Sequence, residues 1–204
     1  MSPINLLMPK LSIAILCGGK SSRLGKDKTR IKVDGTPLYK VIWKKLEGKA
    51  NEIFLQVNPE DDYDLPTRPD LLPERGPLGA IYSALTHASN EWLFISACDL
   101  PNLDPRIIDE LSANLGEAGK TPDAVIPRWD NGYYEPLVAL YRTSLKRDMR
   151  NALRGGTRKI TNFLSRVDMV REISVDRLIS EGSISSHCFF NVNNPEDLKE
   201  LNST

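Results

Sequence analysis

Short apolar segments alternate with helical patterns over roughly the first 130 residues, and this alternation constrains the fold more than any other feature. Four segments predict strands: 11–17, 52–57, 91–98 and 123–127. The first and third, LSIAILC and EWLFISAC, are almost continuously apolar, which is typical of central parallel strands covered on both faces. Between the strands, apolar residues at helical spacing predict helices over 36–49, 76–89 and 104–119. The order of elements predicts a three-layer α/β/α sandwich around a mostly parallel sheet.

The pattern changes after residue 127, where strands and helices no longer alternate regularly. Further strands are predicted over 134–141, 168–175 and 188–192. Further helices are predicted over 142–156, 158–165 and 193–201. The helix at 142–156 is basic and amphipathic, and either a solvated face or a surface for an acidic substrate would account for it. No linker rich in Pro, Gly or Ser divides the chain, so we expect a single domain over residues 1–204.

Charge and composition exclude several classes of protein. The 204 residues include 27 basic and 27 acidic side chains, a balance that argues against a bulk electrostatic nucleic-acid binder. The three cysteines form no CxxC pair, and we expect buried thiols in a reducing cytosol. No apolar run approaches the roughly 20 residues of a membrane span, and the first residues do not resemble a signal peptide. We therefore expect a cytoplasmic protein without a nucleic-acid or membrane partner.

A glycine-rich, cationic loop, LCGGKSSRLGKDK, follows the first predicted strand. Gly18 and Gly19 allow peptide N–H groups to approach a ligand closely, and successive N–H groups can form an anion-binding nest. Arg23 and Lys28 would add a planar fork and a point charge for phosphate oxygens. The loop matches neither the Walker A pattern nor GxGxxG. A phosphate cradle and a plain solvated connection both remain open interpretations.

Polar residues also follow the next two predicted strands. Ligands of open parallel sheets bind outside the carboxyl ends of the strands. Asp99 directly follows the third strand and could hold Mg²⁺, which needs only one or two protein carboxylates when it bridges substrate phosphates. Its alternative role is to cap the turn DLPN. Asn58 follows the second strand, where it could bind a base or ribose or simply end the strand before Pro59.

The loop LCGGKSSRLGKDK resembles the LxGGxSxRMGxDK signature of the MobA-type nucleotidyltransferases, the molybdenum cofactor guanylyltransferases. Five later segments are similar to motifs of this family and occur in the family's order: GPLGAIYSAL, FISACDLPNL, YEPLVALYR, GGTRKITNFL and FFNVNNPEDL. The resemblance covers about residues 11–202. It implies a Rossmann-like fold of the nucleotide-diphospho-sugar transferase type, with a nucleotide-binding half at about 11–127 and an acceptor-side half at about 128–202.

The resemblance also implies an activity and a set of site residues. The family transfers GMP from GTP to the molybdopterin-bound molybdenum cofactor, releases pyrophosphate and uses Mg²⁺. Transferred residue by residue, the expected nucleotide contacts are Leu16, Cys17, Gly18, Gly19, Lys28, Asn58, Asp70 and Asp99. Asp99 would also hold the metal, and Asn191 and Asn193 would lie on the pterin side. Cys17 departs from the family, which usually has Ala at this position.

The expected chemistry is an in-line attack by a phosphate oxygen on the α-phosphorus, with pyrophosphate as the leaving group. Arg23, Lys28 and Asp99 are the expected catalytic residues, acting by charge neutralisation and positioning rather than as nucleophiles. A cytidylyltransferase for the same cofactor, another phosphate-acceptor nucleotidyltransferase and a non-enzymatic nucleotide-binding adaptor remain alternatives. Expected partners are GTP, the molybdopterin cofactor and the molybdoenzyme chaperones or cofactor-insertion proteins that would receive the product.

Overall fold

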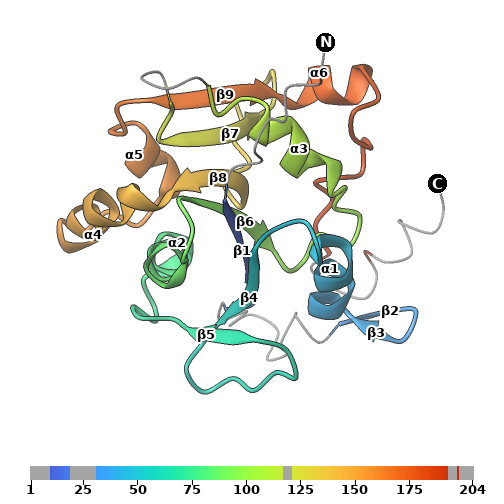
Figure 1. The fold of residues 1–204 in the computed structure, drawn as a ribbon, viewed down its shortest axis with the longest axis horizontal. Helices are drawn as coiled ribbons and strands as arrows, with labels where there is room; N and C mark the ends of the chain where they lie inside the picture. The colour runs from blue at the N-terminus through green and yellow to red at the C-terminus, as the bar shows by residue number, and fades with distance from the viewer. Residues whose placement is uncertain (1–9, 19–30, 117–120, 193–196, 198–204) are drawn as a thin grey trace, which may run out of the picture.

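A seven-stranded sheet forms the centre of the protein in a computed structural model that describes residues 10–18, 31–116, 121–192 and 197. The strand order is β5-β4-β1-β6-β8-β7-β9 (Figure 1). The strands are β1 (Leu11–Leu16), β4 (Glu52–Val57), β5 (Thr67–Pro69), β6 (Trp92–Ala97), β7 (Ala124–Arg128), β8 (Val138–Arg142) and β9 (Val170–Ser174). Strand β8 alone runs antiparallel to its neighbours β6 and β7, so the prediction of a mostly parallel sheet is confirmed.

Helices cover both faces of this sheet (Figure 1). One face packs against α2 (Gly76–His87), α4 (Lys146–Arg154) and α5 (Ile160–Leu164). The other packs against α1 (Leu38–Leu46), α3 (Arg106–Ser112) and α6 (Val175–Ser180). The arrangement confirms the predicted three-layer sandwich. No helix in the described part of the chain combines the length and apolar character needed to cross a bilayer.

Strand β1 shows why the central strands have continuous apolar sequences. Successive side chains of a strand point to opposite faces of the sheet. Ile13 and Ile15 therefore join the core on the α1 side, while Ala14 and Leu16 join the core on the α2 side. All six residues of the strand are buried. Because both faces need apolar side chains, no polar alternation survives in the sequence.

The predicted strand at 188–192 is wrong. Cys188 N–H donates to the Ser185 carbonyl and Phe190 N–H donates to the His187 carbonyl, so this segment turns on itself. Its apolar character comes from burial: Cys188 is fully buried and Phe189 is 7% exposed. A buried turn and a buried strand share the same composition, and periodicity cannot separate them over so few residues.

Several boundaries and small elements also differ from the prediction. The predicted helix at 36–49 begins only at Leu38, because β2 (Lys32–Val33) and β3 (Thr36–Pro37) form a hairpin. Asp34 and Gly35 make its two-residue turn with φ of 48° and 78°, as an Asp-Gly pair favours. The predicted helix at 142–156 begins with a 3-10 turn, η2 (Thr143–Leu145), and β5 and α6 were not predicted. Apart from residue 197, the predicted helix at 193–201 lies outside the described residues.

Candidate active site

The register of the three central parallel strands brings three predicted site residues to one edge of the sheet. Leu16 of β1 pairs with Gln56 of β4 and with Ala97 of β6. Gly18, Asn58 and Asp99 each follow these paired residues by two positions. They therefore leave the sheet side by side at the carboxyl ends of adjacent strands, where open α/β sheets bind ligands.

Gly18 and Asn58 are in close contact. A Cβ atom added to Gly18 would lie 3.2 Å from Asn58 Oδ1, closer than side-chain packing normally allows. The amide of Asn58 is held by Asp61, because its Nδ2 donates to Asp61 Oδ2 at 2.9 Å and Asp61 N–H donates to the Asn58 carbonyl at 3.0 Å. Asn58 thus closes the turn after β4 and also lies against the glycine after β1.

Asp70 is fixed at the same edge by hydrogen bonds. Its N–H donates to the Val57 carbonyl at 2.7 Å, which anchors the segment after β5 to β4. Its Oδ1 accepts from Leu72 N–H at 2.9 Å and from the Ser83 hydroxyl at 2.6 Å. Among the described residues, Oδ2 of Asp70 has no hydrogen-bond partner, so one carboxylate oxygen is held by the protein and the other remains available to a ligand.

Ser83 is a buried residue of α2 that sequence reasoning missed. Its Oγ accepts from Leu71 N–H at 2.9 Å while donating to Asp70, and it also lies 2.9 Å from the Gly79 carbonyl one helical turn earlier. Since the side chain is fully buried, these contacts are shielded from water and fix the loop that carries Asp70. The only signal in the sequence is a single hydroxyl on an apolar helical face.

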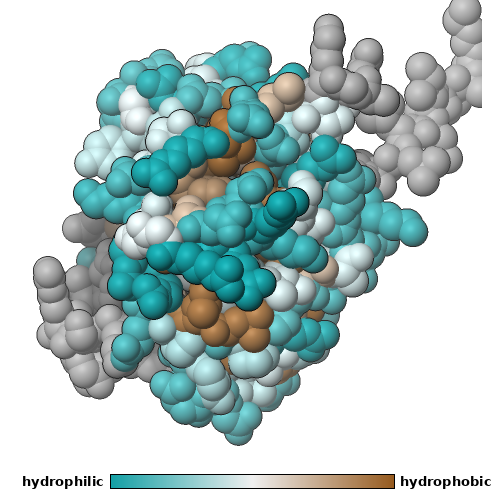
Figure 2. Space-filling view, turned by 90° about the vertical axis from the view of Figure 1, so that its left-hand side faces the viewer, coloured by the Kyte–Doolittle hydropathy of each residue, from teal (hydrophilic) through white to brown (hydrophobic). Residues whose placement is uncertain are grey.

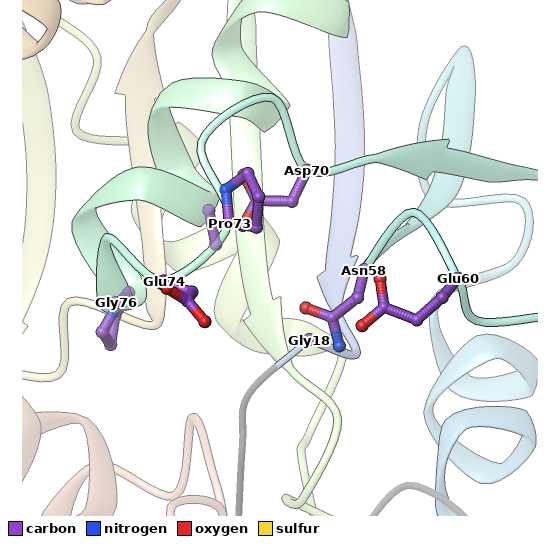
Figure 3. Close-up of a pocket in the computed structure, with 9 residues that line it drawn as sticks. Gly18, Asn58, Glu60, Asp70, Pro73, Glu74 and Gly76 are labelled. Carbon is purple, nitrogen blue, oxygen red and sulfur yellow. The ribbon is translucent and has the colours of Figure 1, made fainter.

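Asp70, Asn58 and Gly18 line one cavity of about 490 Å³ (Figure 3). Its other lining residues are Glu60, Pro73, Glu74, Gly76, Pro77 and Ala80. A volume of this size is typical of small-molecule pockets. The polar side chains among them are carboxylates and one amide, which suit the N–H groups of a base or the hydroxyls of a ribose. Phosphates would be repelled by these carboxylates unless a cation lies between them.

Asp99 is half-buried and is linked by a main-chain hydrogen bond to residues 191–192. Its carbonyl accepts a hydrogen bond from Val192 N–H at 2.8 Å, which places Asn191 beside it. The Asn191 side chain donates from Nδ2 to the Phe189 carbonyl at 3.3 Å. The predicted metal residue and one predicted pterin-side residue are therefore neighbours, although some 90 residues separate them in the sequence.

Asp99 is the predicted magnesium ligand and lies at the carboxyl end of β6. Within residues 10–18, 31–116, 121–192 and 197, no group of three or more His, Cys, Asp or Glu side chains could hold a metal. Mg²⁺ commonly uses one or two carboxylates together with substrate phosphates and waters. A single carboxylate at the strand end is compatible with that mode of binding.

The part of this edge that we predicted as the acceptor side contains the antiparallel strand β8. Ala97 N–H donates to the Leu137 carbonyl at 2.9 Å, so the segment before β8 lies next to the end of β6. Trp129 Nε1 donates to Glu135 Oε1 at 2.8 Å, and the indole meets the Phe189 ring edge-on at 5.8 Å. Burial raises the pKa of Glu135 above its ordinary value, and the bond from Trp129 opposes part of that shift.

The match to a family model decides the relationship of this chain to known proteins. The model described as "MobA-like NTP transferase domain" matches residues 13–170. The chain belongs to the MobA-like NTP transferase family.

Similar proteins cover almost the whole chain. The probable molybdenum cofactor guanylyltransferase of Pyrococcus furiosus is 35% identical over 195 residues, covering 92% of this chain and 94% of the relative. That of Thermococcus gammatolerans is 32% identical over 198 residues, covering 92% and 97%. Among solved structures, molybdopterin-guanine dinucleotide biosynthesis protein A from Archaeoglobus fulgidus has a TM-score of 0.77 and 29% identity, with 93% and 95% of the two chains covered.

Two of the expected nucleotide contacts are buried. Leu16 and Cys17 are buried on opposite faces of the sheet, so their main chain rather than their side chains would face a nucleotide. The Cys17 N–H already donates to the Gln56 carbonyl at 2.8 Å. Four predicted site residues lie outside the described part of the chain: Gly19, Arg23, Lys28 and Asn193.

Proposed function

We propose that this protein is a molybdenum cofactor guanylyltransferase, which transfers GMP from GTP to the molybdopterin-bound cofactor and releases pyrophosphate. The cavity lined by Gly18, Asn58 and Asp70, together with Asp99 at the end of the neighbouring strand β6, supports this function most strongly. Relatives named probable molybdenum cofactor guanylyltransferase match more than nine-tenths of the chain, which supports the same activity.

The cavity is better suited to guanine than to a base with fewer N–H donors. Guanine offers an N1–H and a 2-amino group on one edge, and carboxylate oxygens accept from both. Asp70 presents one oxygen without a partner among the described residues, and Glu60 and Glu74 add further acceptors. Cytosine offers only its 4-amino group, so the same lining would satisfy it less completely.

The reaction requires positioning and charge neutralisation rather than a protein nucleophile. A phosphate oxygen of the cofactor attacks the α-phosphorus of GTP, the new P–O bond forms and the bond to the bridging oxygen breaks, so pyrophosphate leaves. Asp99 would hold Mg²⁺, which supplies neutralisation of the triphosphate charge. Arg23 and Lys28 would stabilise the leaving pyrophosphate, and Asn191 and Asn193 would contact the acceptor.

We also propose the cellular compartment of the enzyme and the proteins that receive its product. We place the enzyme in the cytoplasm, where its three cysteines would remain reduced. We also include a transfer of the finished cofactor to molybdoenzyme chaperones or cofactor-insertion proteins, because the product is of use only to the enzymes that incorporate it.

A nucleotide screen tests this function. Purified protein is incubated with molybdenum cofactor, Mg²⁺ and GTP, CTP or ATP in turn, and pyrophosphate and dinucleotide product are measured. We expect product with GTP and little with the others. Preference for CTP would assign a cytidylyltransferase instead. Binding of GTP without pyrophosphate release would indicate a non-enzymatic adaptor, and pyrophosphate release without the dinucleotide would indicate another acceptor.

A further inference from the structure

A second cavity, of about 250 Å³, lies between the loop after β5 and the helices α2 and α4. We call it the arginine groove. Its apolar surface comes from three leucines and a tyrosine, and its charged surface from three arginines: Leu71, Leu72, Leu153 and Tyr82, with Arg75, Arg150 and Arg154. The groove thus combines an apolar floor with cationic side chains that could bind an anion.

The arginines belong to a local concentration of positive charge. Residues 142–159 contain seven Lys or Arg and one Asp, although the whole chain has a net charge of zero. Arg150 and Arg154 are four positions apart on α4 and therefore share a helical face. In the described part of the chain, none of the three groove arginines forms an ion pair, whereas Arg142 of the same basic segment pairs with Glu91.

The apolar floor is open to solvent at one point. Leu71 is 43% exposed, and only Tyr133 and Met169 are other large hydrophobic side chains with comparable exposure among the described residues. Figure 2 shows this side of the molecule, with hydrophilic side chains across it and hydrophobic patches between them. An exposed leucine among unpaired cations suits a ligand that brings both an apolar group and negative charge.

We propose that the arginine groove docks an acidic segment of a partner protein, with one leucine- or phenylalanine-sized side chain inserted against Leu71, Leu72 and Leu153. The cavity is smaller than typical small-molecule pockets but large enough for an anchoring side chain. Carboxylates flanking the anchor pair with the guanidinium forks. Arginine and tyrosine are also enriched among the residues that dominate binding at protein interfaces.

The groove shares a wall with the nucleotide cavity. Asp70, Pro73 and Glu74 line the cavity, while Leu71, Leu72 and Arg75 of the same loop line the groove. Arg158, after α4, donates from Nη1 to the Glu74 carbonyl at 3.2 Å and ties the basic segment to this loop. A docked segment therefore lies one loop away from the proposed GTP site, yet its binding depends on different residues.

Fluorescence anisotropy with the full chain tests the docking site. The probe is a labelled synthetic ten-residue peptide of alternating Glu and Asp with Leu-Phe at its centre, and the control peptide has Ser-Ser there. We expect saturable binding of the Leu-Phe peptide that weakens as salt concentration rises. The control peptide should bind at least about tenfold more weakly, because losing an anchoring side chain raises the Kd by about tenfold or more.

Matched charge reversals locate the binding. The variant Arg150→Glu/Arg154→Glu should bind the Leu-Phe peptide at least about tenfold more weakly. The variant Lys146→Glu/Arg147→Glu changes the same helix by the same charge outside the groove and should change affinity less than about threefold. Leu71→Ser should weaken binding without changing the charge. Circular dichroism confirms that each variant is folded.

Several results would overturn the docking site. These are absence of saturable binding up to about 1 mM peptide, equal loss in the two double variants, or equal affinity for the two peptides. Tighter binding of a short poly-uridine RNA, displacing the peptide, would assign the surface to nucleic acid instead. None of these measurements uses GTP, so they stand apart from the test of the proposed function.

Discussion

The two sides of the site edge are constructed differently. On the proposed nucleotide side, Gly18, Asn58 and Asp99 follow three parallel strands that end in register, so each residue is placed by the strand before it. On the proposed acceptor side, Trp129, Glu135 and Phe189 come from the segments flanking β7 and β8 and from a late turn, and ring and side-chain contacts bring them together. Strand order places the first group, whereas tertiary packing places the second.

This difference predicts different consequences of substitution. The nucleotide side is anchored by main-chain hydrogen bonds and by the buried hydroxyl of Ser83. The acceptor side contains a half-buried carboxylate in contact with an indole. Changes at the strand-end residues of the first side should alter catalysis or nucleotide affinity with little effect on folding. Changes on the second side should make stability depend differently on pH.

The largest effect is expected for Asp99→Asn. The amide preserves the shape of the side chain but removes the charge that would hold Mg²⁺ against the triphosphate, so turnover should fall by about 10²–10³-fold or more. Pyrophosphate release at saturating Mg²⁺ measures the loss, and thermal denaturation checks the fold. Asp109→Asn, an exposed change on α3, serves as the control. Near wild-type turnover would remove Asp99 from the site.

Next in size is Ser83→Ala. The variant removes a hydrogen bond to a charged carboxylate, worth about 1.5–3 kcal/mol, and frees the loop that carries Asp70. The KM for GTP should rise about tenfold or more, while kcat changes little. Thr86→Ala is a matched control, because Thr86 donates to the Tyr82 carbonyl on the same helix without touching Asp70. Equal kinetics in the two variants would show that Ser83 does not position Asp70.

A smaller effect is expected for Gly18→Ala. The new methyl group would lie 3.2 Å from Asn58 Oδ1, so Asn58 must shift from its present rotamer at a cost of about 0.5–1.5 kcal/mol. GTP affinity, measured by calorimetry, should fall about twofold to tenfold. Gly155→Ala is the comparison, since a Cβ there would meet carbonyl oxygens only at 3.5 Å. Unchanged affinity in Gly18→Ala would place the nucleotide away from this contact.

The smallest effect concerns pH and the acceptor side. Burial raises the folded-state pKa of Glu135, so the ionised carboxylate is disfavoured in the fold and stability falls as pH rises from about 4 through the raised pKa. Glu135→Gln keeps an oxygen for Trp129 and does not titrate. The free energy of unfolding of the variant minus that of wild type, measured with urea, should therefore be larger near pH 7 than near pH 4. A difference that is constant with pH would contradict the assigned burial effect.

Much of the fold could be predicted from the sequence, because apolar runs and helical spacings identify most of the strands and helices. The continuous apolar runs of β1 and β6 identify central strands, and the register of such strands brings Gly18 and Asp99 to one edge. The same reasoning failed for 188–192, where a buried turn has the composition of a strand. The Asp34–Gly35 pair is a recognisable hairpin signal, since both residues have positive φ in the turn.

The parts of the site that were missed depend on contacts between distant residues. Ser83 lies thirteen positions from Asp70, and its hydroxyl could as well have bonded only within its own helix. In the sequence, Glu135 looks like an ordinary charged residue. Only the fold brings Trp129 and the late turn against it. Residues at strand ends can be predicted from the sequence, because ligands of parallel sheets bind at the carboxyl ends of the strands. No comparable rule places Ser83 or Glu135.

If the proposed function is correct, the edge formed by β1, β4 and β6 binds GTP with its base beside Asp70 and its triphosphate beside Asp99. A crystal structure of the protein with GTP and Mg²⁺ tests it most directly. We expect guanine in the cavity lined by Gly18, Asn58 and Asp70, with the metal bound by Asp99 and the phosphates. A nucleotide bound elsewhere on the molecule, or phosphates seated against the carboxylates of that cavity, would contradict it.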